Sequence, residues 1–358
     1  PNGSEKGRKK RRPEMMYWLL HNTTYALPAA QRGVAAFLTA TGVSLVLGIP
    51  IIRWLRRLEV GERTDTTPIE DEELRRQINA KDGTPTMGGL IIFAGLLPAC
   101  ALWGNPLDPH LWLALMCFGA LFALGMVDDW MKLTGKGKGM KVRYKLVVQG
   151  LLGAGLGVAT IATRQGRWQS LVTSLEWIPI TVLAAGMVVW FALVISTMSN
   201  AVNVTDGLDG LAGALSLVAL APICWVSWHS ASGAAGSREM LIFAGGMGGS
   251  VIGFLWHNWH PAQVFMGDTG SLALGGSIGL LALLTGLEFA LPIIGFIFLM
   301  EFGSSVLQVL WFKATGRRIL PIAPLHHIWQ QRGLPETKIV FRFCVVALIV
   351  LFAGSPLL

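Results

Sequence analysis

Long, uninterrupted apolar segments recur along the whole chain, and they limit most strongly what it can fold into. Each is about 17 to 23 residues long, the length that an α-helix needs to cross a bilayer. Hydrophobic residues make up 53% of the 358 residues and charged residues 14%, a balance that soluble enzymes do not show. The sequence therefore predicts an all-α, polytopic membrane protein with about ten transmembrane helices. The expected spans are residues 33–55, 87–103, 111–127, 147–163, 178–199, 208–229, 240–256, 270–287, 290–312 and 340–358.

The side chains within these spans favour close packing of helices. Several spans are rich in glycine and alanine, and small residues let helix backbones approach each other in lipid. The four cysteines, Cys100, Cys117, Cys224 and Cys344, all fall within spans and lack the spacing of metal ligands. We interpret them as small core residues rather than as disulfides or ligands.

The first fourteen residues, PNGSEKGRKKRRPE, are polar, basic and unlike the rest of the chain. They are either a non-native addition or a native basic arm, with Met15 or Met16 as a plausible natural start. The apolar run that follows, MMYWLL, is too short for the core of a signal peptide. We expect residues 15–358 to form a single integral-membrane domain.

Lysine and arginine collect on one side of the predicted topology. Alternate connections carry the basic segments 53–81, 132–145 and 313–338, whereas the opposite connections carry few basic residues. The basic side is expected to face the cytoplasm. The net charge of +8 favours anionic lipid head groups and anionic substrates as partners. The many transmembrane spans argue against nucleic acid as a partner.

Five unusual polar clusters fall on this same side of the membrane. They are TPTMGG (84–89), VDD (127–129), NAVNVTDGLDG (200–210), HNWHPAQVFMGDTGS (257–271) and APLHHI (323–328). Functional residues lie on connections more often than in cores. The convergence predicts one active site at the cytoplasmic surface.

Four polar residues in the third cluster are spaced by three: Asn200, Asn203, Asp206 and Asp209. This spacing keeps side chains near one face of a helix, and the glycines beside them leave room for a ligand. The alternative is an ordinary turn, since Asn, Asp and Gly are common turn residues.

Three carboxylates stand out at the ends of spans. Asp128 and Asp129 leave the third span, where they either form a functional pair or are solvated charges at the membrane edge. Asp268 begins a helix in FMGDTGS, where backbone N–H groups suit a phosphate and the carboxylate suits a hard cation. The alternative for Asp268 is a helix N-cap.

The adjacent residues His326 and His327 point in different directions on any regular element, and no third ligand completes a zinc site. We interpret them as binding phosphate or substrate, with solvent-facing loop histidines as the alternative. Together the carboxylates, lysines and histidines indicate Mg²⁺, a nucleotide diphosphate substrate and a lipid acceptor.

The five clusters, with the downstream run GLPETKIVFRF, resemble the bacterial phospho-N-acetylmuramoyl-pentapeptide transferases, which belong to the polyprenyl-phosphate N-acetylhexosamine-1-phosphate transferases. The resemblance covers the chain from about residue 33 to its end. It implies ten transmembrane helices, a homodimer, and a multi-pass protein of the bacterial inner membrane whose active site faces the cytoplasm. The implied reaction is Mg²⁺-dependent transfer of the phosphosugar from UDP-N-acetylmuramoyl-pentapeptide to undecaprenyl phosphate, which gives lipid I and UMP for peptidoglycan synthesis.

Carried over to this sequence, the resemblance implies that Asp128, Asp129, Asp268 and His326 are catalytic and that Asp268 is the magnesium ligand. The substrate-binding residues that we expect are Lys81, Thr86, Lys145, Asn200, Asn203, Asp206, Asp209, Asn258, Phe265, Gln308 and His327. Phe265 is expected to stack on uracil. The family usually has three successive histidines, whereas the third position here is Ile328, so this sequence lacks the third imidazole.

Two alternatives remain open. One is transfer of N-acetylglucosamine-1-phosphate to the same lipid, against which the GLPETKIV run argues. The other is a transporter or flippase that uses carboxylates near the membrane midplane. The acidic residues lie at the ends of spans, with Glu301 as the main exception, which argues against transport.

Overall fold

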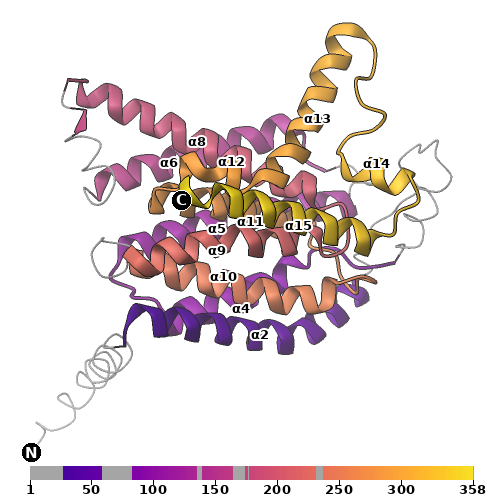
Figure 1. Cartoon of the computed structure of the whole chain (residues 1–358). Coiled ribbons are helices and arrows are strands. Elements are labelled where there is room, and N and C mark those ends of the chain that lie inside the picture. Colours follow the sequence, from indigo (N-terminus) through magenta and orange to yellow (C-terminus); the bar gives the residue numbers. More distant parts are fainter. Residues whose placement is uncertain are drawn as a thin grey trace, which may run out of the picture.

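Helices make up all the regular structure of the part of the chain described in this computed structural model (Figure 1). The described residues are 27–58, 83–134, 139–163, 174–175, 177–230 and 237–357. The basic tail of residues 1–14 and the expected substrate ligand Lys81 lie outside them. The prediction of an all-α protein is confirmed.

The helices follow the apolar segments in chain order. The longer ones are α2 (Ala29–Arg57), α4 (Gly89–Trp103), α5 (Pro109–Thr134), α6 (Val142–Ala162), α8 (Ile180–Thr205), α9 (Leu211–Ser230), α10 (Ser237–Asn258), α11 (Gly267–Thr285), α13 (Phe296–Thr315) and α15 (Glu336–Gly354). Shorter elements are η2 (Glu288–Ala290), α12 (Leu291–Ile294), α14 (His326–Gln331) and η3 (Ser355–Leu357).

Each predicted span overlaps at least one helix, but some boundaries differ. Among the described residues, nine helices are long and apolar enough to cross a membrane, whereas α4 has only 15 residues. The predicted span 290–312 is wrong as one helix, because Gly295 ends α12 and precedes α13. Helices α5 and α8 continue to Thr134 and Thr205, beyond the predicted ends at 127 and 199. These extensions place polar clusters inside helices.

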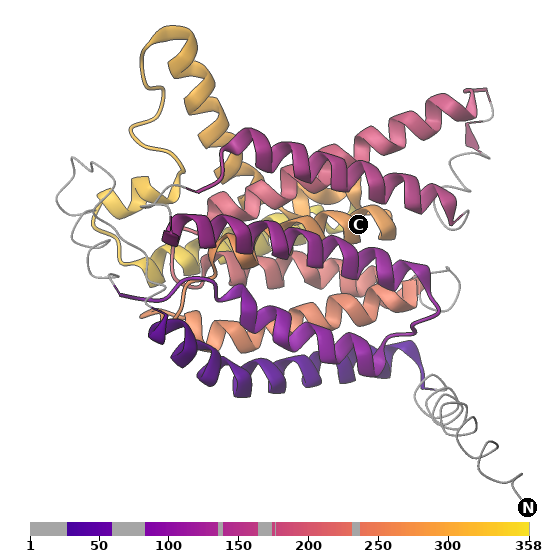
Figure 2. The ribbon, with the colours of Figure 1, turned by 180° about the vertical axis from the view of Figure 1, so that it is seen from behind.

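Helix α11 lies at the centre of the bundle, with nearly every residue buried. Helix α2 lies on one side of the bundle, and the paired helices α6 and α8 lie on the opposite side (Figures 1 and 2). Helix α13 leans away from the bundle, and the chain then returns to the short helix α14 (Figures 1 and 2). The central position of α11 explains how residues at its N-terminus can contact several other helices.

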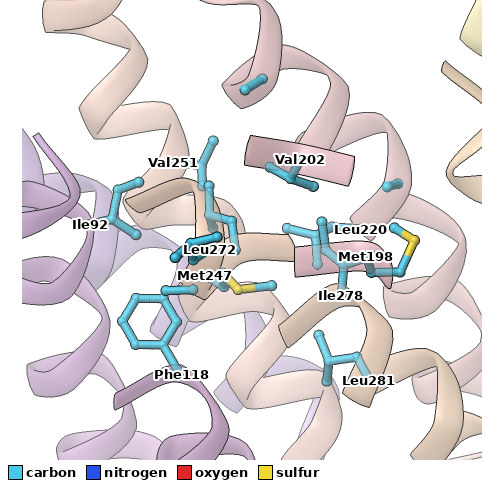
Figure 3. Packing of buried hydrophobic residues seen from close by; sticks show 14 of the residues in the cluster. Ile92, Phe118, Met198, Val202, Leu220, Met247, Val251, Leu272, Ile278 and Leu281 are labelled. Atoms are coloured by element: carbon cyan, nitrogen blue, oxygen red, sulfur yellow. The ribbon is translucent and has the colours of Figure 1, made fainter. Parts of the chain in front are cut away.

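The core around α11 is built from aliphatic, aromatic and methionine side chains of several helices (Figure 3). Leu272 and Ile278 of α11 pack among Met198 of α8, Phe118 of α5 and Met247 of α10. Burying one such side chain contributes roughly 1.5–3 kcal/mol in water. In lipid this contribution falls, and packing and hydrogen bonds carry more of the stability.

Close approach of backbones positions α11 against its neighbours. A β-carbon on Gly125 of α5 would overlap the backbone of Asp268, and one on Gly275 of α11 would overlap the backbone of Met198. Only glycine allows these two separations. The glycine-rich composition of the spans therefore has the packing role that the sequence predicted.

The outward faces of the bundle are apolar. Large exposed side chains such as Leu38 and Val46 of α2 and Phe341 and Phe352 of α15 suit lipid contact. All four cysteines are free: Cys100 and Cys117 are buried, and Cys224 and Cys344 are partly buried.

Candidate active site

The five polar clusters meet at one end of the bundle. The backbone N–H of Phe265 donates to the carbonyl of Pro85 at 2.8 Å, and that of Gly88 donates to the carbonyl of Phe265 at 2.7 Å. These bonds fix the segment before α4 against the loop between α10 and α11. Bonds from Asp129 and Asn203 then join α5 and α8 to the N-terminus of α11. The predicted convergence of the clusters is confirmed.

Asp129 caps helix α11 from a different helix. Its Oδ2 accepts from the backbone N–H and the hydroxyl of Thr269 at 2.9 and 2.7 Å, and its Oδ1 accepts from the backbone N–H of Asp268 at 3.2 Å. The two backbone N–H groups are orphan donors of the helix N-terminus. In this structure Asp129 occupies the N–H groups of Asp268 and Thr269, the place where the sequence suggested a phosphate.

Asp128 and Asp129 are not solvated charges at the membrane edge. Helix α5 continues past them, and their exposed fractions are 0% and 2%. The alternative of an edge cap is thereby excluded. Asp128 differs from its neighbour, because its Oδ1 accepts from the backbone N–H of Met140 at 2.6 Å, whereas its buried Oδ2 lies beside the ammonium groups of Lys132 and Lys145.

Two lysines lie among the three carboxylates. Lys145 Nζ is 2.9 Å from Asp128 Oδ2 and 2.5 Å from Asp268 Oδ2. Lys132 Nζ is 2.9 Å from Asp128 Oδ2, 3.3 Å from Asp129 Oδ1 and 3.0 Å from Asp268 Oδ1. We call these five residues the acidic centre. It contains three carboxylates and two ammonium groups, so its negative charges outnumber its positive charges by one.

The acidic centre fits a hard divalent cation. Ligand oxygens of Asp128, Asp129 and Asp268 all lie within 4.8 Å of one another. Carboxylate oxygens are the ligands that Mg²⁺ prefers in proteins. Asp268 makes no capping bond within its own helix, so the alternative of a simple N-cap does not hold.

The four polar residues spaced by three do not all lie on α8, which ends at Thr205. Asn203 lies on the helix and donates to Asp268 Oδ1 at 2.8 Å and to Ser271 Oγ at 2.9 Å. Asn200 instead donates to Gln149 Oε1 on α6 at 2.6 Å. Asp206 is the C-cap of α8, and the chain then turns. The expectation of one helical face through Asp209 is wrong, because the helix ends at Thr205.

Asp209 lies in a second polar group beside the turn. Its Oδ2 is 2.9 Å from His260 Nδ1 and accepts from the backbone N–H of Ala262 at 3.2 Å. Asn258 accepts from the backbone N–H of Gly210 at 3.0 Å. Glu336 at the start of α15 accepts from the backbone N–H of Asp209 at 3.3 Å. These bonds hold the turn against the loop after α10.

The two histidines have different surroundings, as the sequence predicted. His326 is buried and its Nδ1 is 3.1 Å from Glu301 Oε2, whereas His327 is half-buried with Nδ1 2.7 Å from Gln330 Oε1. A β-carbon on Gly207 would overlap Nε2 of His326. The start of α14, which carries the histidines, therefore packs against the turn that follows α8.

Three other expected substrate ligands have distinct positions. The hydroxyl of Thr86 lies beside Gly267, next to the acidic centre. Phe265 is half-buried on the loop that leads into α11. Gln308 on α13 accepts from the backbone N–H of Leu320 at 2.9 Å and so braces the loop before α14. Their contacts with substrate remain predictions.

Sequence reasoning missed Lys132 and His260. Lys132 stands three and four residues after the paired aspartates, a spacing that places it on the same helical face. That signal was present in the sequence. The contact between His260 and Asp209 spans 51 residues, and no local pattern could have revealed it.

Comparisons with known proteins find two matching family patterns and several relatives. The sequence pattern of Glycosyl transferase family 4 matches residues 111–286, and the phospho-N-acetylmuramoyl-pentapeptide-transferase signature 1 matches residues 81–93. The phospho-N-acetylmuramoyl-pentapeptide-transferase of Neisseria meningitidis is 38% identical over 95% of this chain and 98% of its own length. Proteins of the same name from Granulibacter bethesdensis and Thermodesulfovibrio yellowstonii are also 38% identical, over 90% and 89% of this chain and 91% and 90% of their own lengths.

Proposed function

The chain belongs to the phospho-N-acetylmuramoyl-pentapeptide-transferase family, and from that membership we propose the reaction that it catalyses. It transfers phospho-N-acetylmuramoyl-pentapeptide from UDP-N-acetylmuramoyl-pentapeptide to undecaprenyl phosphate, at the cytoplasmic face of the bacterial inner membrane. The products are lipid I and UMP. The family is one of enzymes, so a transporter no longer competes as an interpretation.

The observation that carries this proposal is the acidic centre at one end of a bundle of apolar helices. The phosphate of a lipid acceptor lies at the membrane surface, and a nucleotide donor approaches that surface from water. Asp268 offers a carboxylate at this boundary, with Lys132 and Lys145 within ion-pair distance. Phosphoryl transfer needs such charges, because catalysis rests on positioning and on neutralising the transferring oxygens.

The residues of the acidic centre would hold Mg²⁺ through Asp268, with Asp128 beside it. Bound there, the cation would neutralise charge on the diphosphate of the donor. Asp129 is less suited to this task, since both of its oxygens accept hydrogen bonds from the start of α11. Its role is to position Asp268.

The two lysines carry the positive charges of the acidic centre on flexible side chains. Lys132 is 40% exposed at its side chain and Lys145 is 14% exposed. When a cation binds among the carboxylates, their ammonium groups can turn to phosphate oxygens of the two substrates. Lysine serves this purpose as a flexible point charge.

The chemical step is a direct displacement. An oxygen of undecaprenyl phosphate attacks the sugar-linked phosphorus, a new P–O bond forms, and the bond to UMP breaks with its electrons on the departing UMP oxygen. The second pKa of a phosphate monoester is near 6, so the attacking oxygen is already largely deprotonated at neutral pH. Asp128 therefore acts mainly by holding charge and geometry, and as a base only for the minority protonated acceptor.

The nucleotide and sugar occupy the surface formed by the turn after α8 and the loop before α11. We assign Asn203, Asp206 and Phe265 to the nucleotide, with Phe265 stacked on uracil. His326 and His327 contact phosphate and sugar. Lys81, Thr86, Asn200, Asp209, Asn258 and Gln308 complete the proposed substrate-binding set.

The test is release of UMP by the protein purified in detergent. We expect release from UDP-N-acetylmuramoyl-pentapeptide only when undecaprenyl phosphate and Mg²⁺ are both present, and little from UDP-N-acetylglucosamine. Asp268→Asn should reduce turnover by orders of magnitude while the protein stays folded. Efficient release from UDP-N-acetylglucosamine, or normal turnover in the Asp268→Asn variant, would reject the assignment.

A further inference from the structure

Glu301 is a fully buried carboxylate that the proposed reaction does not yet use. It lies within α13, and its exposed fraction is 0%. A buried carboxylate is costly unless it is paired and hydrogen-bonded. In the described part of the chain, its carboxylate oxygens contact the backbone N–H and the ring of one residue, His326.

The pair fixes the orientation of the imidazole ring. Glu301 Oε1 accepts from the backbone N–H of His326 at 3.1 Å, and Oε2 lies 3.1 Å from Nδ1 of the same residue. A carboxylate can only accept, so Nδ1 carries the proton that faces it. The other ring nitrogen, Nε2, then points away from Glu301.

Nε2 of His326 is buried and has no hydrogen-bond partner. It lies against Gly207, in the turn that directly follows α8. The ring of His327 lies on another side, with centroids 4.2 Å apart. Buried polar atoms without a partner are rare in folded proteins, and one that faces a proposed substrate surface indicates a ligand.

The charge of the ligand determines the charge of the ring. A diphosphate oxygen is an acceptor, so Nε2 must donate to it, and Nδ1 already donates to Glu301. The ring then carries both protons and a positive charge when the donor is bound. Glu301 supplies the counterion, because it is the carboxylate within ion-pair distance of His326 in the described residues.

We propose that Glu301 is a positioning residue that orients His326 and balances its charge, so that Nε2–H donates to the diphosphate of the nucleotide donor. This inference rests on the proposed function, since it takes the donor to be a nucleoside diphosphate sugar. The arrangement resembles other enzymes in which a buried carboxylate orients a catalytic histidine. It gives a role to Glu301, the main exception to the placement of acidic residues at the ends of spans.

The test compares Glu301→Gln, Glu301→Asp, His326→Gln and the double variant Glu301→Gln/His326→Gln. Initial rates of UMP release give kcat, and KM for the UDP substrate, at saturating undecaprenyl phosphate. We expect Glu301→Gln to lower kcat by roughly tenfold to a hundredfold, the range for a hydrogen bond to a charged group. Glu301→Asp keeps the charge and should recover part of this loss.

The double variant separates positioning from a general structural role. If Glu301 acts through His326, then adding Glu301→Gln to His326→Gln should change kcat by no more than about twofold. Ser304→Ala is the matched control on the same helix, because Ser304 Oγ donates to the backbone carbonyl of Glu301 at 2.7 Å and not to its side chain. This control should stay near the wild-type rate.

Several results would overturn the proposal. If Glu301→Gln has a normal kcat while His326→Gln has a lowered kcat, the Glu301 carboxylate does not act through His326. Losses that multiply in the double variant, or loss of folding by Glu301→Gln in both backgrounds, would make Glu301 a packing residue instead. Failure of the proposed function is distinct, because the wild-type protein itself would then release no UMP.

Discussion

Substitutions of the two adjacent aspartates of α5 should have different effects: one should lower the stability of the fold, and the other should lower the rate of turnover. Asp129→Ala removes the carboxylate that caps α11, whereas Asp128→Asn removes one charge from the acidic centre. The cap includes three donors, namely the backbone N–H groups of Asp268 and Thr269 and the hydroxyl of Thr269. Asp128 accepts one such bond, from the backbone N–H of Met140, which an asparagine oxygen can replace.

The magnitude follows from the donors that each change leaves buried. Each unsatisfied buried donor costs about 1–3 kcal/mol, so Asp129→Ala should destabilise the fold by at least about 3 kcal/mol, less a relief of like-charge repulsion. Asp128→Asn leaves two carboxylates with Lys132 and Lys145, which balances the charges of the centre. Its effect on unfolding should be below about 1 kcal/mol.

The assay is thermal unfolding in detergent, followed by the fluorescence of the 14 tryptophans. Asp129→Ala should lower the apparent melting temperature by about 5 °C or more, and Asp128→Asn should change it by less than about 2 °C. UMP release from the same samples should fall most in Asp128→Asn, relative to folded protein. Equal melting temperatures for both variants would refute the capping role of Asp129.

Two further predictions concern charge and packing. Lys132→Met removes a cation from the acidic centre, so the Mg²⁺ concentration at half-maximal rate should fall by roughly threefold or more, and an increase would contradict the ion pairs with Lys132. Gly125→Ala should abolish folding or sharply lower the yield of folded protein, because its β-carbon would overlap the backbone of Asp268. Gly119→Ala on the same helix is the control, since its β-carbon meets no atom within 4 Å, and equal yields would contradict the packing.

The class of fold could be predicted from the sequence because apolar length alone sets the number of crossings. The boundaries could not, since hydropathy ends where polar residues begin. Asp128 and Asn203 lie in helices that continue past the apolar part, because their side chains face protein partners rather than lipid. Hydropathy also cannot detect the break at Gly295, which lies inside an apolar run.

The location of the site was predictable, but the pairing of its groups was not. The topology places the clusters of Asp129 and Asp268 on one side of the membrane. It does not show that Asp129 takes the N–H groups at the start of α11, because that bond joins residues 140 positions apart. The same holds for Glu301 and His326, whose pairing depends on how α13 and α14 meet.

The most direct test of direct transfer is a single-turnover reaction without the lipid acceptor. The protein, in excess over UDP-N-acetylmuramoyl-pentapeptide and with Mg²⁺ present, is quenched at intervals, and both UMP and the mass of the intact protein are measured. We expect no UMP above background and an unchanged mass, and one equivalent of UMP once undecaprenyl phosphate is added. Release of UMP without the acceptor, with a phosphosugar attached to Asp128 or Asp129, would contradict the account and establish a two-step mechanism.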